Sequence, residues 1–270
     1  LSTRRIEGRN DRLVTIAILP MMSCAGRLPI YMMFVSALFP SHLQATVLFG
    51  IYAAGILLAL LCARLLKNTF FKTVQRDSPH RLKKLRIPSL RKVGLLMWSR
   101  AFMYVRKAGT FILGASIILW FLNTYPRPEE GTVENAAAAM EHSYAGQIGH
   151  WMEPVTRVAG FDWKVNSALL GAFAAKEIFV TQMGILYAVQ DGDSGAEAQQ
   201  TLNARLKASY TPLQGISIMI FCLIALPCIG TVTVAKREAG TWWFALAQFT
   251  GLTLMGFVAA TVVYQAGLLM

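Results

Sequence analysis

Two cysteines lie where strongly apolar segments are interrupted, and their thiols are the side chains best suited to chemistry in this chain. Cys24 lies between Pro20 and Pro29. Cys228 directly follows Pro227. Proline breaks a helix and frees a carbonyl oxygen, and a helix that starts after the break directs its positive dipole end at the thiol, which favours the metal-binding thiolate. The pattern predicts a path for a soft or borderline metal ion at two helix breaks.

Two methionines precede Cys24 and extend the candidate ligand set. Met21 and Met22 add thioether sulfurs, and the carbonyls freed by the neighbouring prolines add oxygens. All of these groups can hold a cation that has lost its water. Methionine and cysteine are also common fillers of helix interfaces, so packing is the alternative interpretation of this segment.

Glu177 is the only acid in the apolar stretch 165–189. A charge at bilayer depth costs at least about 3 kcal/mol, so this carboxylate should face protein, a water path or a cation. On a continuous helix Phe173, Glu177 and Thr181 would share one face. The alternative interpretation is an ion pair with Arg27, because adjacent residues on a helix do not face each other. We interpret Glu177 as a third metal ligand.

The composition is that of a membrane protein. The 270 residues are 55% hydrophobic with a mean hydropathy of +0.47, and 15% are charged, against about 25% in soluble domains. We predict an all-α fold: a polytopic transmembrane helical bundle with proline-broken gate helices and a basic interfacial connector helix. It would be a single membrane domain over 1–270, with a first broken helix and second span in 1–66, the connector in 67–107, and the remaining spans in 108–270.

The connector holds half of the positive charge. Thirteen of the 26 basic residues lie between Arg64 and Lys107, with Asp77 as the only acid. Positive loops between membrane spans face the cytoplasm and meet lipid headgroups, so the bilayer is the expected partner and nucleic acid is not. Ser89 would cap a basic amphipathic helix that lies in the headgroup layer, and a third span would follow from Ala108.

The orientation of the later segments depends on the stretch 165–189. The acidic segment 127–162 is expected outside. A single crossing of 165–189 would place 190–211 and the C-terminus inside. A stretch that dips in and returns would invert everything after it.

Known nucleotide and protease motifs are absent. The sequence contains no GxxxxGK[ST], HExxH or GxSxG pattern. The four cysteines match neither a disulfide framework nor a CxxC zinc pattern. We therefore expect a transporter part that is not an enzyme and holds no cofactor.

The chain resembles the C-terminal membrane (gate) portion of the bacterial ferrous iron transporter FeoB family. The matching segments are 10–31, 86–123, 153–180 and 225–238. They contain an Asn-Asp-Arg start, a Ser-Cys break, an Ala-Lys-Glu helix and a Pro-Cys break, in the family's order. Two departures are the Ala25-Gly26 order and Gly230, where the family has alanine.

The resemblance implies a multi-pass protein of the bacterial inner membrane that moves Fe²⁺ into the cytoplasm. By motif position, Cys24 and Cys228 match the family's candidate iron-path cysteines, and we place Met21, Met22 and Glu177 near them. GTP would be hydrolysed by an N-terminal GTPase domain of the same parent protein, which this chain lacks. The resemblance also allows a small cytoplasmic accessory protein and a homo-oligomer as partners.

Two other functions stay open at this point. A gate-type carrier of an organic solute such as a nucleoside would use the same helix breaks, although the fourth and fifth apolar stretches are poor in amides and aromatics. A membrane thiol-redox protein would need paired thiols; Cys222 and Cys228 would point to different faces of one helix, whereas Cys24 and Cys228 could meet in space.

Overall fold

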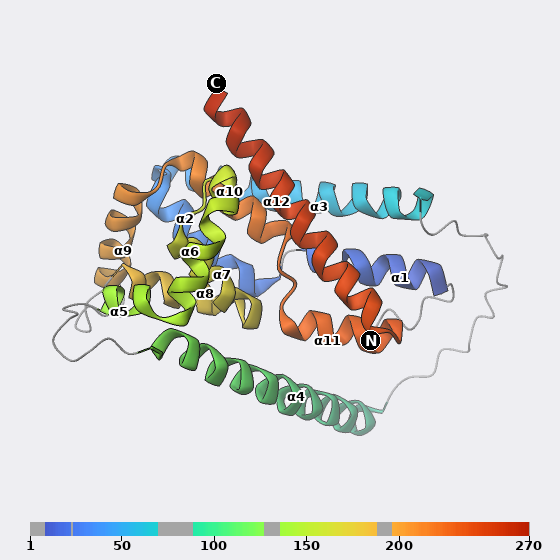
Figure 1. The fold of residues 1–270 in the computed structure, drawn as a ribbon. Coiled ribbons are helices and arrows are strands. Elements are labelled where there is room, and N and C mark those ends of the chain that lie inside the picture. Colours follow the sequence, from blue (N-terminus) through green and yellow to red (C-terminus); the bar gives the residue numbers. More distant parts are fainter. Residues whose placement is uncertain (1–8, 23, 70–88, 127–135, 188–195, 270) are drawn as a thin grey trace.

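The computed structural model describes residues 9–22, 24–69, 89–126, 136–187 and 196–269 (Figure 1). In chain order the elements are α1 (Arg9–Ile18), the 3-10 turns η2 (Leu19–Met21) and η3 (Ala25–Arg27), α2 (Leu28–Leu38), α3 (Ser41–Thr69), α4 (Leu90–Thr124), α5 (Ala136–His142), α6 (Tyr144–Thr156), η4 (Arg157–Ala159), α7 (Trp163–Ala174), α8 (Lys176–Leu186), α9 (Ala196–Ser209), α10 (Pro212–Ile224), α11 (Ile229–Ala239) and α12 (Trp242–Leu269). The described residues form no strand, which confirms the all-α class.

Four described segments are long and apolar enough to cross a membrane. They are Asn10–Leu38, Ser41–Thr69, Pro212–Ala239 and Trp242–Leu269. The first joins α1 to α2 and the third joins α10 to α11, so two of the four contain a helix break. These segments confirm the predicted transmembrane bundle with broken helices.

The two proline-marked breaks lie where the sequence predicts them. One separates α1 from α2 after Pro20, and the other separates α10 from α11 at Pro227. At the second of these, Leu226 has a φ of 54°, a conformation that residues with a side chain rarely adopt. The chain therefore leaves the helix sharply between Ala225 and Cys228 rather than bending gradually.

A third break, at Ala175, separates α7 from α8. Ala175 has φ −151° and ψ 133°, the values of an extended chain. The three residues on either side include no proline or glycine. Local sequence signals therefore do not mark this break.

α7 and α8 fold back on each other at Ala175 and form a hairpin. An added Cβ on Gly171 of α7 would lie 2.9 Å from Ile178 Cγ2 of α8. With its amide oriented to donate, Gln182 of α8 reaches the Ser167 carbonyl of α7 at 3.2 Å. The two arms have 12 and 11 residues, too few to cross a hydrocarbon layer of about 30 Å.

The hairpin corrects two expectations. The described part of this stretch, 165–187, folds back on itself and does not form one long helix, which agrees with the re-entrant alternative and not with the single crossing. Phe173 lies on the arm before the turn, while Glu177 and Thr181 lie on the arm after it, so the three do not share one helical face.

One end of the bundle, here the Lys67 end, gathers the start of α1 and the ends of α3 and α11. Asp11 of α1 pairs with Lys67 of α3 at 3.6 Å. Arg12 donates to the Glu238 carbonyl of α11 at 3.5 Å. These segments lie together at the right of Figure 1.

The opposite end, here the Asn203 end, gathers the ends of α2 and α12 and the helix α9. Ser36 of α2 donates to Asn203 of α9 at 3.3 Å. Tyr210, just after α9, donates to Asp162 at 2.9 Å, and Gln265 of α12 donates to a carbonyl of the adjacent η4 at 2.8 Å. The described part of 190–211 and the end of α12 therefore lie opposite the start of α1, because the hairpin before them does not cross.

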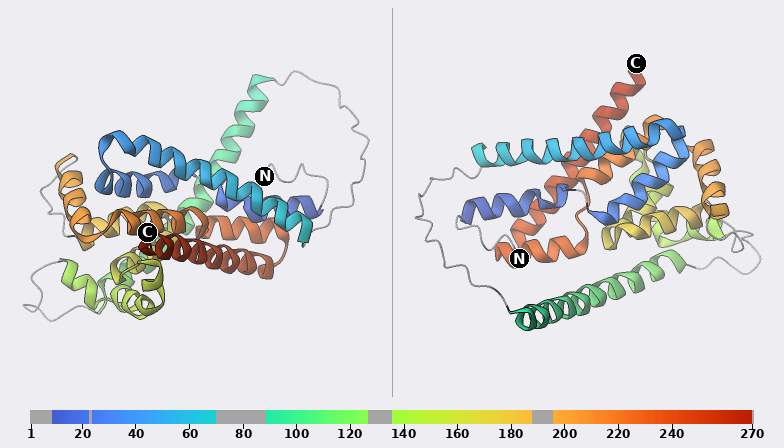
Figure 2. Two further views of the ribbon diagram at one scale, coloured as in Figure 1. Left: turned by 90° about the horizontal axis from the view of Figure 1, so that it is seen from above. Right: turned by 180° about the vertical axis from the view of Figure 1, so that it is seen from behind.

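α4 is one uninterrupted helix of 35 residues that lies along one side of the bundle (Figure 1; Figure 2, right). Ser89 occupies its N-cap position, as predicted, but its side chain makes no capping hydrogen bond. The boundary expected at Ala108 between a surface helix and a third span is absent. No proline interrupts this segment, so the helix continues through it.

α2 lies at the centre of the buried core. Seven of its eleven residues are buried, among them Tyr31 and Phe34. The Phe34 ring packs against Phe179 of α8 and Tyr210, with ring centroids 6.2 Å apart in both pairs. Because α2 is held on several sides, the η3 turn that precedes it has a well-defined position next to α8.

We predict that stability at alkaline pH depends on Tyr210. Its hydroxyl lies 2.9 Å from both carboxylate oxygens of Asp162, and burial together with this charge raises the pKa of Tyr210 far above its usual value. In the unfolded chain the tyrosine ionises near pH 10. Its contribution to stability is therefore complete below about pH 10 and is lost as the pH rises above it.

Melting temperatures measured between pH 8 and 11.5 test this prediction. Tyr210→Phe should be less stable at neutral pH, because one buried charge-assisted hydrogen bond contributes about 1.5–3 kcal/mol. Above about pH 10 the variant should lose less stability than the parent. Parallel pH profiles for the two proteins would contradict the assignment.

Candidate functional site

The three helix breaks meet at the turn of the α7–α8 hairpin. Gly26 of η3 faces the first turn of α8, and an added Cβ there would lie 2.8 Å from Glu177 Oε1 and 3.8 Å from Lys176 Cβ. On its other side, the Lys176 ammonium donates to the Cys222 carbonyl of α10 at 3.2 Å. The start of α8 therefore lies between the two broken membrane helices.

The three strongest candidate ligands all lie at helix starts. Cys24 is the N-cap residue of η3, Cys228 is the N-cap residue of α11, and Glu177 lies in the first turn of α8. Neither thiol makes a capping hydrogen bond to its helix. The amide ends of helices favour negative charge, so this placement suits thiolate and carboxylate ligands.

The surroundings of the two thiols differ. Cys24 is exposed. Cys228 is half-buried, with its Sγ 3.2 Å from the Thr231 hydroxyl oxygen. A Cβ on Gly230 would lie 3.9 Å from this sulfur, an ordinary contact distance. The glycine therefore leaves space beside the Cys228 thiol.

The two methionines are separated by burial. Met21 is 2% exposed and belongs to the hydrophobic core, whereas Met22 is 56% exposed. The position of Met21 agrees with the packing interpretation. Within the described part of the chain, no three His, Cys, Asp or Glu side chains lie close enough to hold a metal ion. The candidate ligands therefore line the breaks without forming a closed coordination shell.

Arg27 uses its donors on the carbonyls that the first break frees. Its Nη2 donates to the Pro20 carbonyl at 2.6 Å, and its Nη1 donates to those of Met21 and Met22 at 3.3 and 3.5 Å. The side chain is 1% exposed. A guanidinium thus bonds three carbonyls at the first break, and Arg27 does not form the alternative ion pair with Glu177.

Lys176, which directly follows the third break, plays the corresponding role at the second break. Its side chain is 6% exposed, and its ammonium lies within electrostatic range of Arg27 and of the thiols of Cys24, Cys222 and Cys228. The thiols of the two predicted breaks therefore approach the same cation. Sequence reasoning missed this role, although a lysine within an apolar stretch was the available signal.

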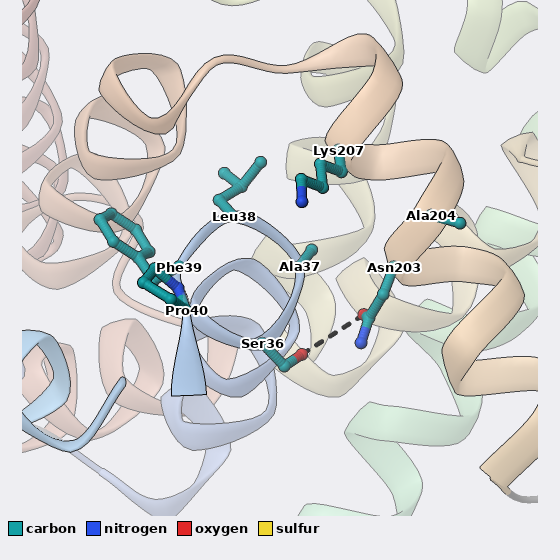
Figure 3. A pocket seen from close by; sticks show the side chains of 8 residues that line it. All are labelled: Ser36, Ala37, Leu38, Phe39, Pro40, Asn203, Ala204 and Lys207. Atoms are coloured by element: carbon teal, nitrogen blue, oxygen red, sulfur yellow. Dashed lines mark hydrogen bonds between the residues drawn. The ribbon is translucent and has the colours of Figure 1, made fainter. Parts of the chain in front are cut away.

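A cavity of about 310 Å³ lies away from these breaks, at the Asn203 end (Figure 3). It is lined by the end of α2 and by α9, namely Ser36, Ala37, Leu38, Phe39, Pro40, Asn203, Ala204 and Lys207. Its lining includes none of the predicted ligands. The cavity therefore does not form part of the candidate path.

Two family models match the chain. The Gate model, described as nucleoside recognition, matches residues 105–242, which include both arms of the hairpin and the second and third breaks. The model of the ferrous iron transport protein B C terminus matches residues 48–100. The chain belongs to the FeoB family. It is accordingly a membrane protein, and the resemblance inferred from its motifs is confirmed.

Curated FeoB-family relatives match the chain over nearly its whole length. They include an Fe(2+) transport protein A/Fe(2+) transporter FeoB fusion protein of Porphyromonas gingivalis (35% identical, 100% of this chain, 36% of the relative), and Fe(2+) transporter FeoB of Campylobacter jejuni (33%, 97% and 43%) and of Methanocaldococcus jannaschii (35%, 99% and 39%). The chain thus spans well under half the length of these FeoB relatives. No solved structure matches it.

Gly256 lets α12 pack directly on the second break, between α10 and α11, and we predict that it tolerates no side chain. An added Cβ would lie 2.7 Å from Ala225 Cβ and 3.0 Å from its backbone nitrogen, neither of which can move independently of the break. Gly256→Ala should therefore destabilise the protein by about 1–3 kcal/mol.

Gly251→Ala is the matched control on the same helix. A Cβ at Gly251 would have no neighbour within 4 Å, so the change should be neutral or stabilising by up to about 1 kcal/mol. Melting temperatures in detergent distinguish the two variants. Equal effects at both positions would show that α12 does not rest on Ala225.

Proposed function

We propose that this chain is the membrane path of a ferrous iron uptake system and moves Fe²⁺ into the cytoplasm past the breaks at Cys24 and Cys228. The observation that carries the proposal is the position of the α8 start between the two thiol-bearing breaks, with Glu177 beside Gly26. The names of the FeoB relatives, all Fe(2+) transporters, support iron as the cargo.

The proposed ligands suit an ion that must also leave. Fe²⁺ accepts mixed sulfur and oxygen ligands, here the thiols of Cys24 and Cys228, the Glu177 carboxylate and the exposed thioether of Met22. Met21 would contribute its buried thioether when the first break opens. Ligands spread along a path rather than closed around one point allow weak, successive binding, which conduction requires.

The distribution of charge supports a direction of transport. The Lys67 end carries Arg12 and the end of α11 with Lys236 and Arg237, and it precedes the basic segment 70–88. Positive charge favours the cytoplasmic side, so Fe²⁺ would leave there. The acidic segment 127–162 and the Asn203 end would face outward. In a bacterium this membrane would be the inner one.

Energy and regulation would come from outside this chain. We propose that GTP is bound and hydrolysed by a GTPase domain in the longer parent, and that this chain is not itself an enzyme and holds no cofactor. The fusion of Fe(2+) transport protein A to FeoB in the P. gingivalis relative supports a small accessory protein as a further partner. Homo-oligomers of the parent are a further proposal.

Uptake of ⁵⁵Fe²⁺ into liposomes tests the path. The full-length transporter that contains this chain is reconstituted as wild type, Cys24→Ser and Cys228→Ser. We expect each variant to lose at least about tenfold in uptake rate, the scale on which changes at metal sites act. Serine replaces the thiol with a hydroxyl of similar size that can form the same hydrogen bonds, so folding should be preserved.

Cys62→Ser is the matched control, because this half-buried thiol lies within the uninterrupted helix α3, 3.7 Å from Met255 Sδ. It should retain normal uptake. Unchanged uptake in both Cys24→Ser and Cys228→Ser would remove the proposed path. If the liposomes took up a labelled nucleoside and no ⁵⁵Fe²⁺, the organic-solute carrier would be favoured instead.

A further inference from the structure

The buried ammonium of Lys176 compensates a defect that the second break, between α10 and α11, creates. In an uninterrupted helix the Cys222 carbonyl would accept from the amide of residue 226. Here α10 ends at Ile224, Leu226 turns to positive φ, and Pro227 has no N–H. The Cys222 carbonyl is left at the negative end of α10, and Lys176 of the hairpin donates to it at 3.2 Å.

Few other groups hold this cation. Lys176 forms no ion pair within the described residues, and the nearest carboxylate in sequence, Glu177, extends over Gly26 instead. Arg27 is a second buried cation within electrostatic range, so the two charges repel each other. The Lys176 ammonium is therefore tethered by one hydrogen bond to an uncharged carbonyl and by the dipole of α10.

Arg27 provides the contrast. Its guanidinium is held by three carbonyls of its own segment, with the shortest contact at 2.6 Å. Arg27 thus belongs to the fixed structure of the first break. Lys176 reaches across from a different element and donates a single hydrogen bond to α10.

We propose that Lys176 is a displaceable resident cation, which occupies the carbonyl end of α10 when the path is empty and is expelled when a divalent cation binds at the thiol-bearing breaks. The proposal rests on the proposed iron path and adds a gating residue to it. An arriving dication would repel the ammonium, and the departure of Lys176 would free both the Cys222 carbonyl and the α7–α8 turn. The hairpin would then respond to the occupancy of the path.

Binding of Co²⁺ to the full-length transporter tests the proposal, with the absorption of thiolate-bound cobalt as the readout. We expect Lys176→Met and Lys176→Gln to bind Co²⁺ about tenfold or more tightly than wild type, because a competing charge is gone. Lys176→Arg should stay within about twofold of wild type. The glutamine variant keeps a donor for the Cys222 carbonyl and serves if the methionine variant does not fold.

Lys164→Met is the matched control, since Lys164 lies at the other end of the same hairpin, 4.4 Å from the centroid of the Tyr187 ring. It should bind Co²⁺ as wild type does. Hydrogen exchange gives a second readout. Amides 174–178 should exchange faster in wild type when Co²⁺ is added, and in Lys176→Met they should exchange fast without it.

The outcomes separate this inference from the proposed function. Equal Co²⁺ affinity in folded wild type, Lys176→Gln and Lys176→Met would overturn the role of Lys176 and leave the iron path standing. Absence of Co²⁺ binding in every variant, with no iron uptake, would overturn both. Weaker binding in both neutral variants would mean that Lys176 organises the site rather than competing with the metal.

Discussion

The structure depends on how the ends of interrupted helices are satisfied inside an apolar bundle. A broken helix leaves carbonyl oxygens without donors, and no water reaches them in the middle of a membrane. Here the donors include two buried cations: Arg27 bonds the carbonyls around Pro20, and Lys176 bonds that of Cys222. Gln248 of α12 bonds the carbonyls of Ile16 and Ala17 at the end of α1. Each cation also matches the negative end of the helix it caps, so the breaks are stable without a bound ion.

The same geometry sorts the charges around the breaks. The charged groups of Arg27 and Lys176 bond carbonyls at helix ends. Cys24, Cys228 and Glu177 lie at helix starts, where amide groups favour negative charge. A path for a dication between these groups would therefore alternate attractive ligands with fixed or movable positive charge. This alternation suits transient binding better than a closed metal site, in agreement with the absence of a three-ligand cluster among the described residues.

The re-entrant hairpin also reconciles the orientation of the bundle with its charge. Because α7 and α8 return to the side from which they entered, the basic end of α11 lies with the start of α1 and with Lys67. A single crossing would have placed Lys236 and Arg237 on the opposite side from the other basic segments. Lys67, Lys236 and Arg237 thus lie at one end of the bundle, where positive charge favours the cytoplasmic side.

The sequence by itself determined the helical class, the breaks at Pro20 and Pro227, and the presence of Cys24 and Cys228 beside them, because proline and apolar length act locally. The break at Ala175 could not be predicted. It carries no helix-breaking residue and follows from the packing of Gly171 against Ile178 and Gln182. Only the tertiary structure decided the roles of Arg27 and Lys176, since a cation bonds whichever orphan carbonyl the fold brings within reach.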